Sequence, residues 1–277
     1  MQECEHAAAI VREADALLIT AGAGMGVDSG LPDFRGNEGF WKAYPPYRRL
    51  GRSFVEMANP AGFASNPPFA WGFYGHRQNL YRKTSPHPGF GILKNWGESR
   101  AEGSFVMTSN VDGHFQRSGF SEETVYEVHG SIHFLQCSLP CRQRRIWSAD
   151  DLRVEVDEGS MEATGELPNC PDCGATARPN ILMFGDWNYL SDRNDEQRRR
   201  LDAWLEERRG SRVAVVEFGA GSAVPTVRLF SEEIAARFPR ASLIRVNPRE
   251  AEIGLAGDHV SIAGGALETI KAIDEWI

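Results

Sequence analysis

Residues 22–35 of this chain read Gly22-Ala23-Gly24-Met25-Gly26-Val27-Asp28-Ser29-Gly30-Leu31-Pro32-Asp33-Phe34-Arg35. They follow an apolar run, residues 16–20, which predicts a buried strand of a parallel sheet. Doubly wound folds bind a pyrophosphate at a glycine-rich turn after such a strand, because glycine lets the backbone approach the phosphates closely. The glycine spacing is GxGxG instead of the usual GxGxxG, so the glycines alone are a weak signal. Residues 32–35 add a rigid turn, an acid, an aromatic ring and a cation just beyond the turn.

The composition limits the kind of protein. The 277 residues, 42% of them hydrophobic, are enough for one sizeable core plus a small appended module. A formal net charge of −8 argues against a general affinity for nucleic acid or an anionic membrane. No stretch approaches the roughly 20 apolar residues of a membrane span, and the first residues lack the pattern of a signal peptide. We therefore expect a cytoplasmic protein with no nucleic-acid or membrane partner.

Four short, continuous apolar runs predict the fold class. They are residues 16–20, 105–108, 213–218 and 243–246. Such runs are typical of strands that are covered on both faces, and each leads into a cluster of Gly, Asn or Pro. The sequence predicts an α/β fold, a doubly wound, Rossmann-like parallel sheet formed by residues 1–133 and 179–277. The clusters at the carboxyl ends of the strands should meet at one crevice.

Residues 134–178 differ in composition and predict a smaller inserted domain. They contain two close cysteine pairs, Cys137-x3-Cys141 and Cys170-x2-Cys173. Four thiolates with this spacing suit one tetrahedral Zn²⁺, and they leave no open coordination position, so the zinc would be structural. Unliganded core thiols and a redox pair are the alternatives, while disulfides are less suited to a cytoplasmic chain.

The segment at residues 22–35 resembles the signature GAGxSxxSGIPDFRG of the sirtuin family, with Gly26 where the family usually has serine. The resemblance extends over residues 16–268 and is that of a divergent bacterial member. It implies an NAD-dependent protein-lysine deacylase, a deacetylase or a desuccinylase/demalonylase. Such an enzyme consumes NAD, acts on an acyl-lysine protein or peptide, and releases nicotinamide and O-acyl-ADP-ribose.

The resemblance also implies which residues bind NAD. Thr108-Ser109-Asn110-Val111-Asp112 stands where the family has TQNxD, so Ser109 replaces a glutamine. Residues 219–222 stand where the family has GTS, again in a turn after a strand. The implied NAD-binding set is Gly22, Ala23, Gly24, Met25, Asp33, Phe34, Arg35, Ser109, Asn110, Asp112, Gly219, Gly221, Ser222, Asn247 and Ala266.

His129, followed by Gly130, occupies the general-base position of the family. The implied task is to take a proton from a ribose hydroxyl, and an imidazole with an ordinary pKa of about 6.5 suits it. Asp112 would hold the nicotinamide carboxamide, and Asn110 would contact the ribose and order water. The alternatives are a structural histidine and a simple Asx turn after a strand.

The resemblance places the substrate on two further segments. Residues 178–186 resemble the RPxVVxFGE segment, along which a peptide pairs in extended form, and this implicates Phe184 and Gly185. Tyr74 and Arg77 match the Tyr-x-x-Arg pair of sirtuins that remove malonyl and succinyl groups, where the phenol and the guanidinium bind the acyl carboxylate. The alternative is that Tyr74 packs in the core and Arg77 lies on the surface. We expect a helical region near residues 38–90 to cap the cofactor site.

Two other functions remain open. An NAD hydrolase or a protein ADP-ribosyltransferase would keep the NAD pocket and lose the deacylation geometry, and Ser109 favours this alternative. A non-catalytic NAD-sensing module is the other, and the presence of both His129 and Asp112 argues against it.

Overall fold

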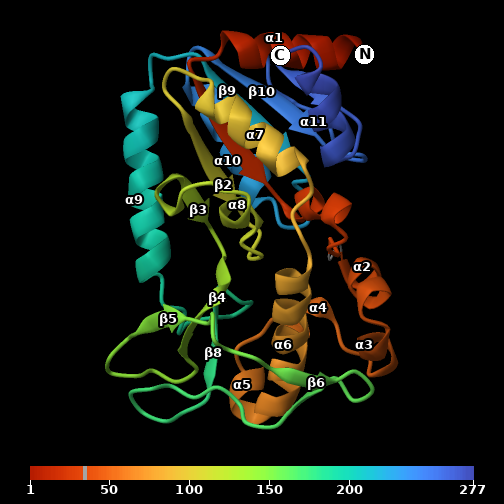
Figure 1. Cartoon of the computed structure of the whole chain (residues 1–277), viewed down its shortest axis with the longest axis vertical. Coiled ribbons are helices and arrows are strands. Elements are labelled where there is room, and N and C mark those ends of the chain that lie inside the picture. The colour runs from red at the N-terminus through yellow and green to blue at the C-terminus, as the bar shows by residue number, and fades with distance from the viewer. Residues whose placement is uncertain (34–35) are drawn as a thin grey trace.

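The computed structural model describes residues 1–33 and 36–277, and its centre is a six-stranded parallel sheet (Figure 1). The strand order is β3-β2-β1-β9-β10-β11. The strands are β1 (Ala16–Ala21), β2 (Ser104–Thr108), β3 (Val125–Glu127), β9 (Val213–Phe218), β10 (Ala241–Val246) and β11 (Val260–Ile262). The chain builds one half of the sheet outward from β1 and the other half outward from β9, which is the Rossmann arrangement. The predicted fold class is confirmed, and all four predicted strands are present.

Helices cover both faces of this sheet. Alternate residues of β1 point to opposite faces, so Leu17 and Ile19 pack in one core cluster and Leu18 in another. The first cluster includes residues of α1 (Gln2–Glu13), α7 (Gly89–Glu98) and α11 (Ala266–Asp274). The second includes residues of α9 (Asp192–Glu207) and α10 (Thr226–Arg237). Burial on both faces explains why the strands read as continuous apolar runs.

A smaller lobe lies below the parallel sheet in Figure 1. Its three-stranded sheet has the order β5-β4-β8, and a separate hairpin pairs β6 with β7. These strands are β4 (Gly130–Cys137), β5 (Ile146–Ser148), β6 (Glu155–Asp157), β7 (Glu162–Thr164) and β8 (Ala177–Ile181). The helices of this region are α2 (Gly36–Ala43), α3 (Pro45–Arg49), α4 (Phe54–Met57), α5 (Gly62–Ser65) and α6 (Pro67–Lys83). The sheet extends past both expected limits of the insert, 134 and 178, and the domain division stays a prediction.

In most doubly wound folds an α-helix follows the pyrophosphate turn. The turn after β1 in this chain leads into a different element. It continues into a short 3₁₀ helix, η1 (Ala23–Ser29), which ends at Gly30 with a φ of +90°. Glycine has low helix propensity, and Gly24 and Gly26 fall within this short helix, with Gly22 at its N-cap. Two further short helices are α8 (His114–Arg117) and η2 (Glu122–Thr124).

Within the described residues, no helix has the length and apolar character needed to cross a membrane. The cytoplasmic location stays a prediction.

Two glycines of helix α6, Gly72 and Gly75, allow it to pack closely against the β6–β7 hairpin. A Cβ at Gly72 would lie 1.9 Å from the carbonyl oxygen of Met161, and a Cβ at Gly75 would lie 2.5 Å from Cγ1 of Val154. The hairpin backbone therefore approaches the helix closely enough to exclude any side chain at Gly72. This contact fixes the position of α6, which carries Tyr74 and Arg77.

The close approach at Gly72 reverses the usual effect of a glycine-to-alanine change in a helix. Gly72→Ala should lower the free energy of unfolding by about 1–3 kcal/mol or more, because overpacking forces the backbones apart. Gly91→Ala in α7 is the matched control, since a Cβ there meets nothing within 4 Å, and it should be neutral or stabilise by up to about 1 kcal/mol. Urea unfolding of both variants measures the difference, and equal effects would contradict the proposed contact.

Candidate functional site

The turns after β1 and β9 meet backbone to backbone. The N–H of Gly22 donates to the carbonyl oxygen of Phe218 at 3.0 Å, and the N–H of Gly24 donates to that of Gly219 at 3.1 Å. A Cβ at Gly22 would lie 2.7 Å from the oxygen of Gly219, and a Cβ at Gly219, whose φ is +60°, would lie 2.4 Å from Cα of Gly24. Both turns therefore need glycine. They lie where the order of winding reverses, which is the place where doubly wound folds bind their ligands.

A cavity of about 550 Å³ opens at these turns. Predicted site residues from segments far apart in the sequence line it: Gly22, Ala23, Asp33, Tyr74, Arg77, Ser109, Asn110, Asp112, His129, Phe184, Gly219 and Gly221. The structure thus brings the glycine turns, the candidate base and the Tyr-x-x-Arg pair to one cavity.

Six predicted residues do not line this cavity, namely Gly24, Met25, Gly185, Ser222, Asn247 and Ala266. Several of them support residues that do. Asn247 is buried, and its Nδ2 donates to the carbonyl oxygen of Ala220 at 2.8 Å, which holds the turn after β9. Ser222 is exposed and donates through both its N–H and its hydroxyl to Glu250. Phe34 and Arg35 lie outside the described residues.

The segment after β2 is tied to the first glycine turn. Nδ2 of Asn110 donates to the carbonyl oxygen of Gly22 at 3.0 Å. Oδ1 of Asp112 accepts the N–H of His114 at 2.9 Å. A Cβ at Gly26 would lie 3.8 Å from Oδ2 of the same carboxylate and only 3.3 Å from Cδ1 of Leu31. Serine at position 26 would therefore crowd Leu31, and the glycine leaves space beside Asp112.

His129 lies in the connection between β3 and β4, with its backbone held on two sides. Its carbonyl oxygen accepts the N–H of Leu182 at 2.9 Å, and the N–H of Val128 donates to Thr108 at 2.8 Å. Burial lowers the pKa of the imidazole, while a hydrogen bond with the backbone of Ser109 acts in the opposite direction. A lowered pKa leaves the imidazole neutral at neutral pH, the form that can accept a proton.

The far end of the cavity is formed by one face of α6. Tyr74 is fully buried, its hydroxyl has no hydrogen-bond partner among the described residues, and burial raises its pKa to about 12. Arg77 is 6% exposed, so the alternative in which it lies on the surface is wrong, and both Nε and Nη2 donate to the hydroxyl of Tyr81, at 3.1 and 2.8 Å. Tyr81 was not predicted. Its spacing of seven residues from Tyr74 and four from Arg77 places it on the same helical face, and this spacing could have identified it.

The segment after β8 forms one rim of the cavity. Leu182 and Phe184 are 43% and 39% exposed, and the N–H of Phe184 donates to the carbonyl oxygen of Ala58 at 2.9 Å. The turn that follows is closed by Asp186, which forms a fully buried, two-point ion pair with Arg178 at 2.8 Å. Aspartate therefore completes this turn even though the family pattern has glutamate.

Most of the lining residues that the sequence analysis missed are apolar. They include Leu31, Phe54, Val55, Ala58, Val111, Ile181, Met183, Ala223, Val224 and Val227. Single apolar residues on short elements carry no pattern that separates a cavity wall from a core.

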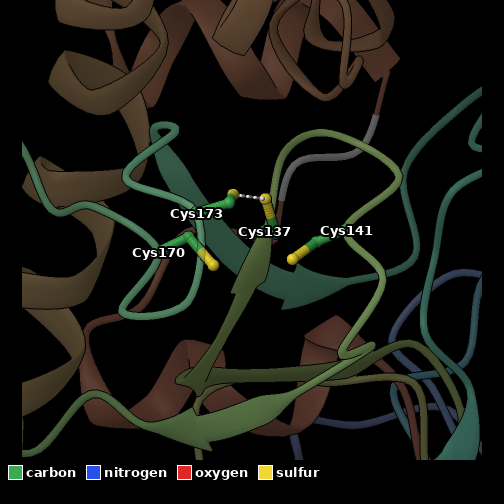
Figure 2. A group of neighbouring side chains, drawn as sticks. All are labelled: Cys137, Cys141, Cys170 and Cys173. Carbon is green, nitrogen blue, oxygen red and sulfur yellow. Dashed lines mark hydrogen bonds between the residues drawn. The ribbon is translucent and has the colours of Figure 1, made fainter.

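The four cysteines of the predicted metal site come together at one end of β4 and β8 (Figure 2). Their sulfur atoms all lie within 4.8 Å of one another, and the sulfurs of Cys137 and Cys173 are 3.6 Å apart. Sulfurs on a tetrahedral Zn²⁺ with bonds of about 2.3 Å would be separated by about 3.8 Å, so the cluster suits one such ion. Within the described residues no disulfide is present, and 3.6 Å is too long for one.

Comparison with known proteins identifies the family. The family model named Sir2 family matches residues 22–202. A relative from Aquifex aeolicus (strain VF5), named NAD-dependent protein deacylase, is 29% identical over 246 residues that cover 87% of each chain. A solved structure described under the mechanism and regulation of Sir2 enzymes is 27% identical, with a TM-score of 0.67 over 99% of this chain and 97% of that one. A Sir2 complex with a deacetylated p53 peptide and 3'-O-acetyl ADP ribose is 22% identical, with a TM-score of 0.67 over 97% and 96% of the two chains, and shows the likeness of fold. Since the family model covers more than half of the chain, this protein belongs to the Sir2 family.

Proposed function

We propose that this protein is an NAD-dependent protein-lysine deacylase. One observation carries the proposal: a single cavity joins the interlocked glycine turns, the candidate base His129 and the Tyr74–Arg77 face of α6. Such a cavity can receive a dinucleotide from one side and an acylated side chain from the other. The names of the relatives in the family support the same activity.

The residues of the cavity suit NAD. The turns at Gly22 and Gly219 line the cavity with backbone, so a pyrophosphate would lie against them and accept hydrogen bonds from nearby amides. Asn110 and Asp112 would contact the ribose and the carboxamide at the nicotinamide end. When bound, NAD supplies a ribose carbon that can be attacked as nicotinamide leaves.

His129 would act as the general base. Its lowered pKa keeps the imidazole neutral, so Nδ1 or Nε2 can take the proton of a ribose hydroxyl. Apolar side chains around it, such as Val111 and Ile181, exclude water from the reacting centre. The backbone hydrogen bond from Leu182 ties the base to the rim of the cavity.

The substrate would be a protein or peptide that carries an acyl-lysine. The exposed residues Leu182 and Phe184 would form the edge along which an extended peptide pairs, with Gly185 in the turn that follows. The relative that was solved with a deacetylated peptide supports this assignment.

We further propose that the acyl group carries a carboxylate, as in malonyl- or succinyl-lysine. Tyr74 and Arg77 both line the cavity, and the buried hydroxyl of Tyr74 has no hydrogen-bond partner in the part of the chain that the structure describes. A buried hydroxyl without a partner is costly, and a carboxylate can accept hydrogen bonds from both groups.

The four-cysteine cluster would hold one structural Zn²⁺. Four thiolates fill the coordination sphere, so the ion has no open position for catalysis. It would fix β4 against the segment that leads into β8.

The alternative function is an NAD hydrolase or protein ADP-ribosyltransferase. Ser109 favours it, because its side chain is shorter than the glutamine of the family and it lines the cavity beside Asn110. A poorly positioned ribose could then react with water or with a protein side chain.

The role of His129 is tested by His129→Ala. The variant should bind NAD with unchanged affinity, because the glycine turns hold the phosphates, and deacylation should fall by about 10² to 10⁴. Isothermal titration with NAD and mass spectrometry of the products measure the two effects. Wild-type deacylation by the variant is incompatible with a general base. Free or protein-linked ADP-ribose from the wild type, without acyl-ADP-ribose, would indicate the alternative function.

The acidic-acyl proposal is tested by Arg77→Met and Tyr74→Phe. Each should weaken turnover of succinyl-lysine relative to acetyl-lysine, which has no second carboxylate. Truncating one partner of a buried charge pair costs about 2–5 kcal/mol, so Arg77→Met should change the succinyl-to-acetyl ratio of kcat/KM by more than about tenfold. Tyr74→Phe removes only a hydroxyl that has no hydrogen-bond partner in residues 1–33 and 36–277, so the fold should be retained. Equal losses on both peptides in both variants would rule out carboxylate recognition.

The metal proposal is tested by Cys170→Ser, with Cys4→Ser as the control. Cys170 belongs to the cluster and Cys4 does not. Losing a ligand should lower the melting temperature, because metal binding supplies part of the folding free energy. Protein purified without chelator should hold about one zinc ion per chain by elemental analysis, and a value near zero would contradict the proposal.

A further inference from the structure

Strand β3 is an edge strand of only three residues, and side chains from helix α9 cover its outer edge. Oε1 of Gln197 accepts the backbone N–H of Glu127 at 3.1 Å, and Nδ2 of Asn194 donates to the backbone carbonyl of the same residue. Gln197 and Asn194 are buried and stand three residues apart on the helix. Two side-chain amides therefore take the place of the next strand. Figure 1 shows α9 running beside β3 and down toward β5.

The side chain of Glu127 is held by the same helix. Its carboxylate is 1% exposed and lies 2.6 Å from Nη2 of Arg193. An unpaired carboxylate at this depth would be strongly destabilising, so the ion pair is a requirement of the packing. Arg193 also pairs with Glu122 at 3.2 Å.

The guanidinium of Arg193 contacts the small lobe as well. Its central carbon lies 4.2 Å from the centroid of the Phe134 ring, in strand β4. One side chain thus touches the last residue of β3 and the middle of β4. His129 lies in the connection between these two strands, two residues after Glu127 and five before Phe134.

Other contacts also hold His129. Leu182 donates to its carbonyl oxygen, Thr108 accepts from the preceding Val128, and the imidazole is hydrogen-bonded to the backbone of Ser109. We propose that Arg193 is a positioning residue for His129, because it fixes both strands that carry the connection and so holds the imidazole at the cavity. This inference rests on the proposed function. Arg193 is absent from the cavity lining and would act only through His129.

A positioning role for Arg193 predicts which reaction steps should slow when the residue is changed. In the proposed function His129 would take its proton after nicotinamide has left, so a displaced imidazole should slow the later steps and spare the exchange of labelled nicotinamide into NAD. Misplacement of a catalytic group by about 1 Å can cost about 10²-fold in rate. A merely structural role would lower exchange, deacylation and NAD affinity together.

The test compares Arg193→Met, Arg193→Lys and Arg200→Ala in the full chain. Methionine keeps an apolar stem over Phe134 and removes the charge, while lysine keeps the charge. Arg200 is the matched control, because it lies on the same helix and pairs with Glu123 and Glu196, and none of its ion pairs involves Glu127. The readouts are kcat for deacylation, nicotinamide exchange, the Kd for NAD and the ring signals of His129 in ¹H–¹⁵N spectra, assigned with His129→Ala.

Arg193→Met should lower kcat for deacylation by at least about tenfold, with exchange and the Kd for NAD within about twofold of the wild type. Arg193→Lys should recover part of the loss, Arg200→Ala should match the wild type, and the ring signals of His129 should shift only in the Arg193 variants. Wild-type deacylation by Arg193→Met, or parallel losses in exchange and affinity, would overturn the inference. If the wild-type protein does not deacylate, the proposed function fails. The positioning role is then judged from the ring signals of His129 alone, and unchanged signals in Arg193→Met would overturn it.

Discussion

The contact between the turns after β1 and β9 is the constraint on which the rest of the site depends. Gly24 donates to Gly219, and neither Gly22 nor Gly219 has room for a Cβ. Because the backbones touch at the point where the winding reverses, the segment after β2 can bond directly to the first turn through Asn110. The glycines are required for this contact between the turns, and the cavity opens at the turns that the contact holds together.

The features that the sequence predicted correctly are those encoded over short distances. Apolar runs predicted the four strands, because a strand buried on both faces carries apolar residues at most of its positions. Close cysteine pairs predicted the metal cluster, because each short spacing keeps two sulfurs near one another, and the pairing of β4 with β8 then brings the two pairs together. The fold class and the grouping of cavity residues follow from these patterns together with the resemblance to the family.

The features that the sequence did not predict depend on packing between distant segments. The covering of β3 by α9 joins Glu127 to Arg193, Asn194 and Gln197, and no local pattern marks a polar helix as a substitute strand. The bonding of Arg77 to Tyr81 was equally hidden, because a helix with aromatic residues on several faces has no clear apolar stripe. The 3₁₀ form of η1 reflects glycines that serve the close approach of backbones and not helix formation.

The metal cluster and the candidate base lie at opposite ends of the same pair of strands. In the register of β4 with β8, Cys137 pairs with Ala177 at one end and Gly130 with Ile181 at the other. His129 directly precedes Gly130, and Leu182 directly follows Ile181. The N–H of Leu182 donates to the carbonyl oxygen of His129. A metal ion bound at the cysteine end would therefore resist a shift in the register of β4 with β8. Such a shift would move His129 together with the segment that would bind the peptide. The zinc, although it has no open position for chemistry, would thus contribute to the geometry of the reaction through the strands it joins.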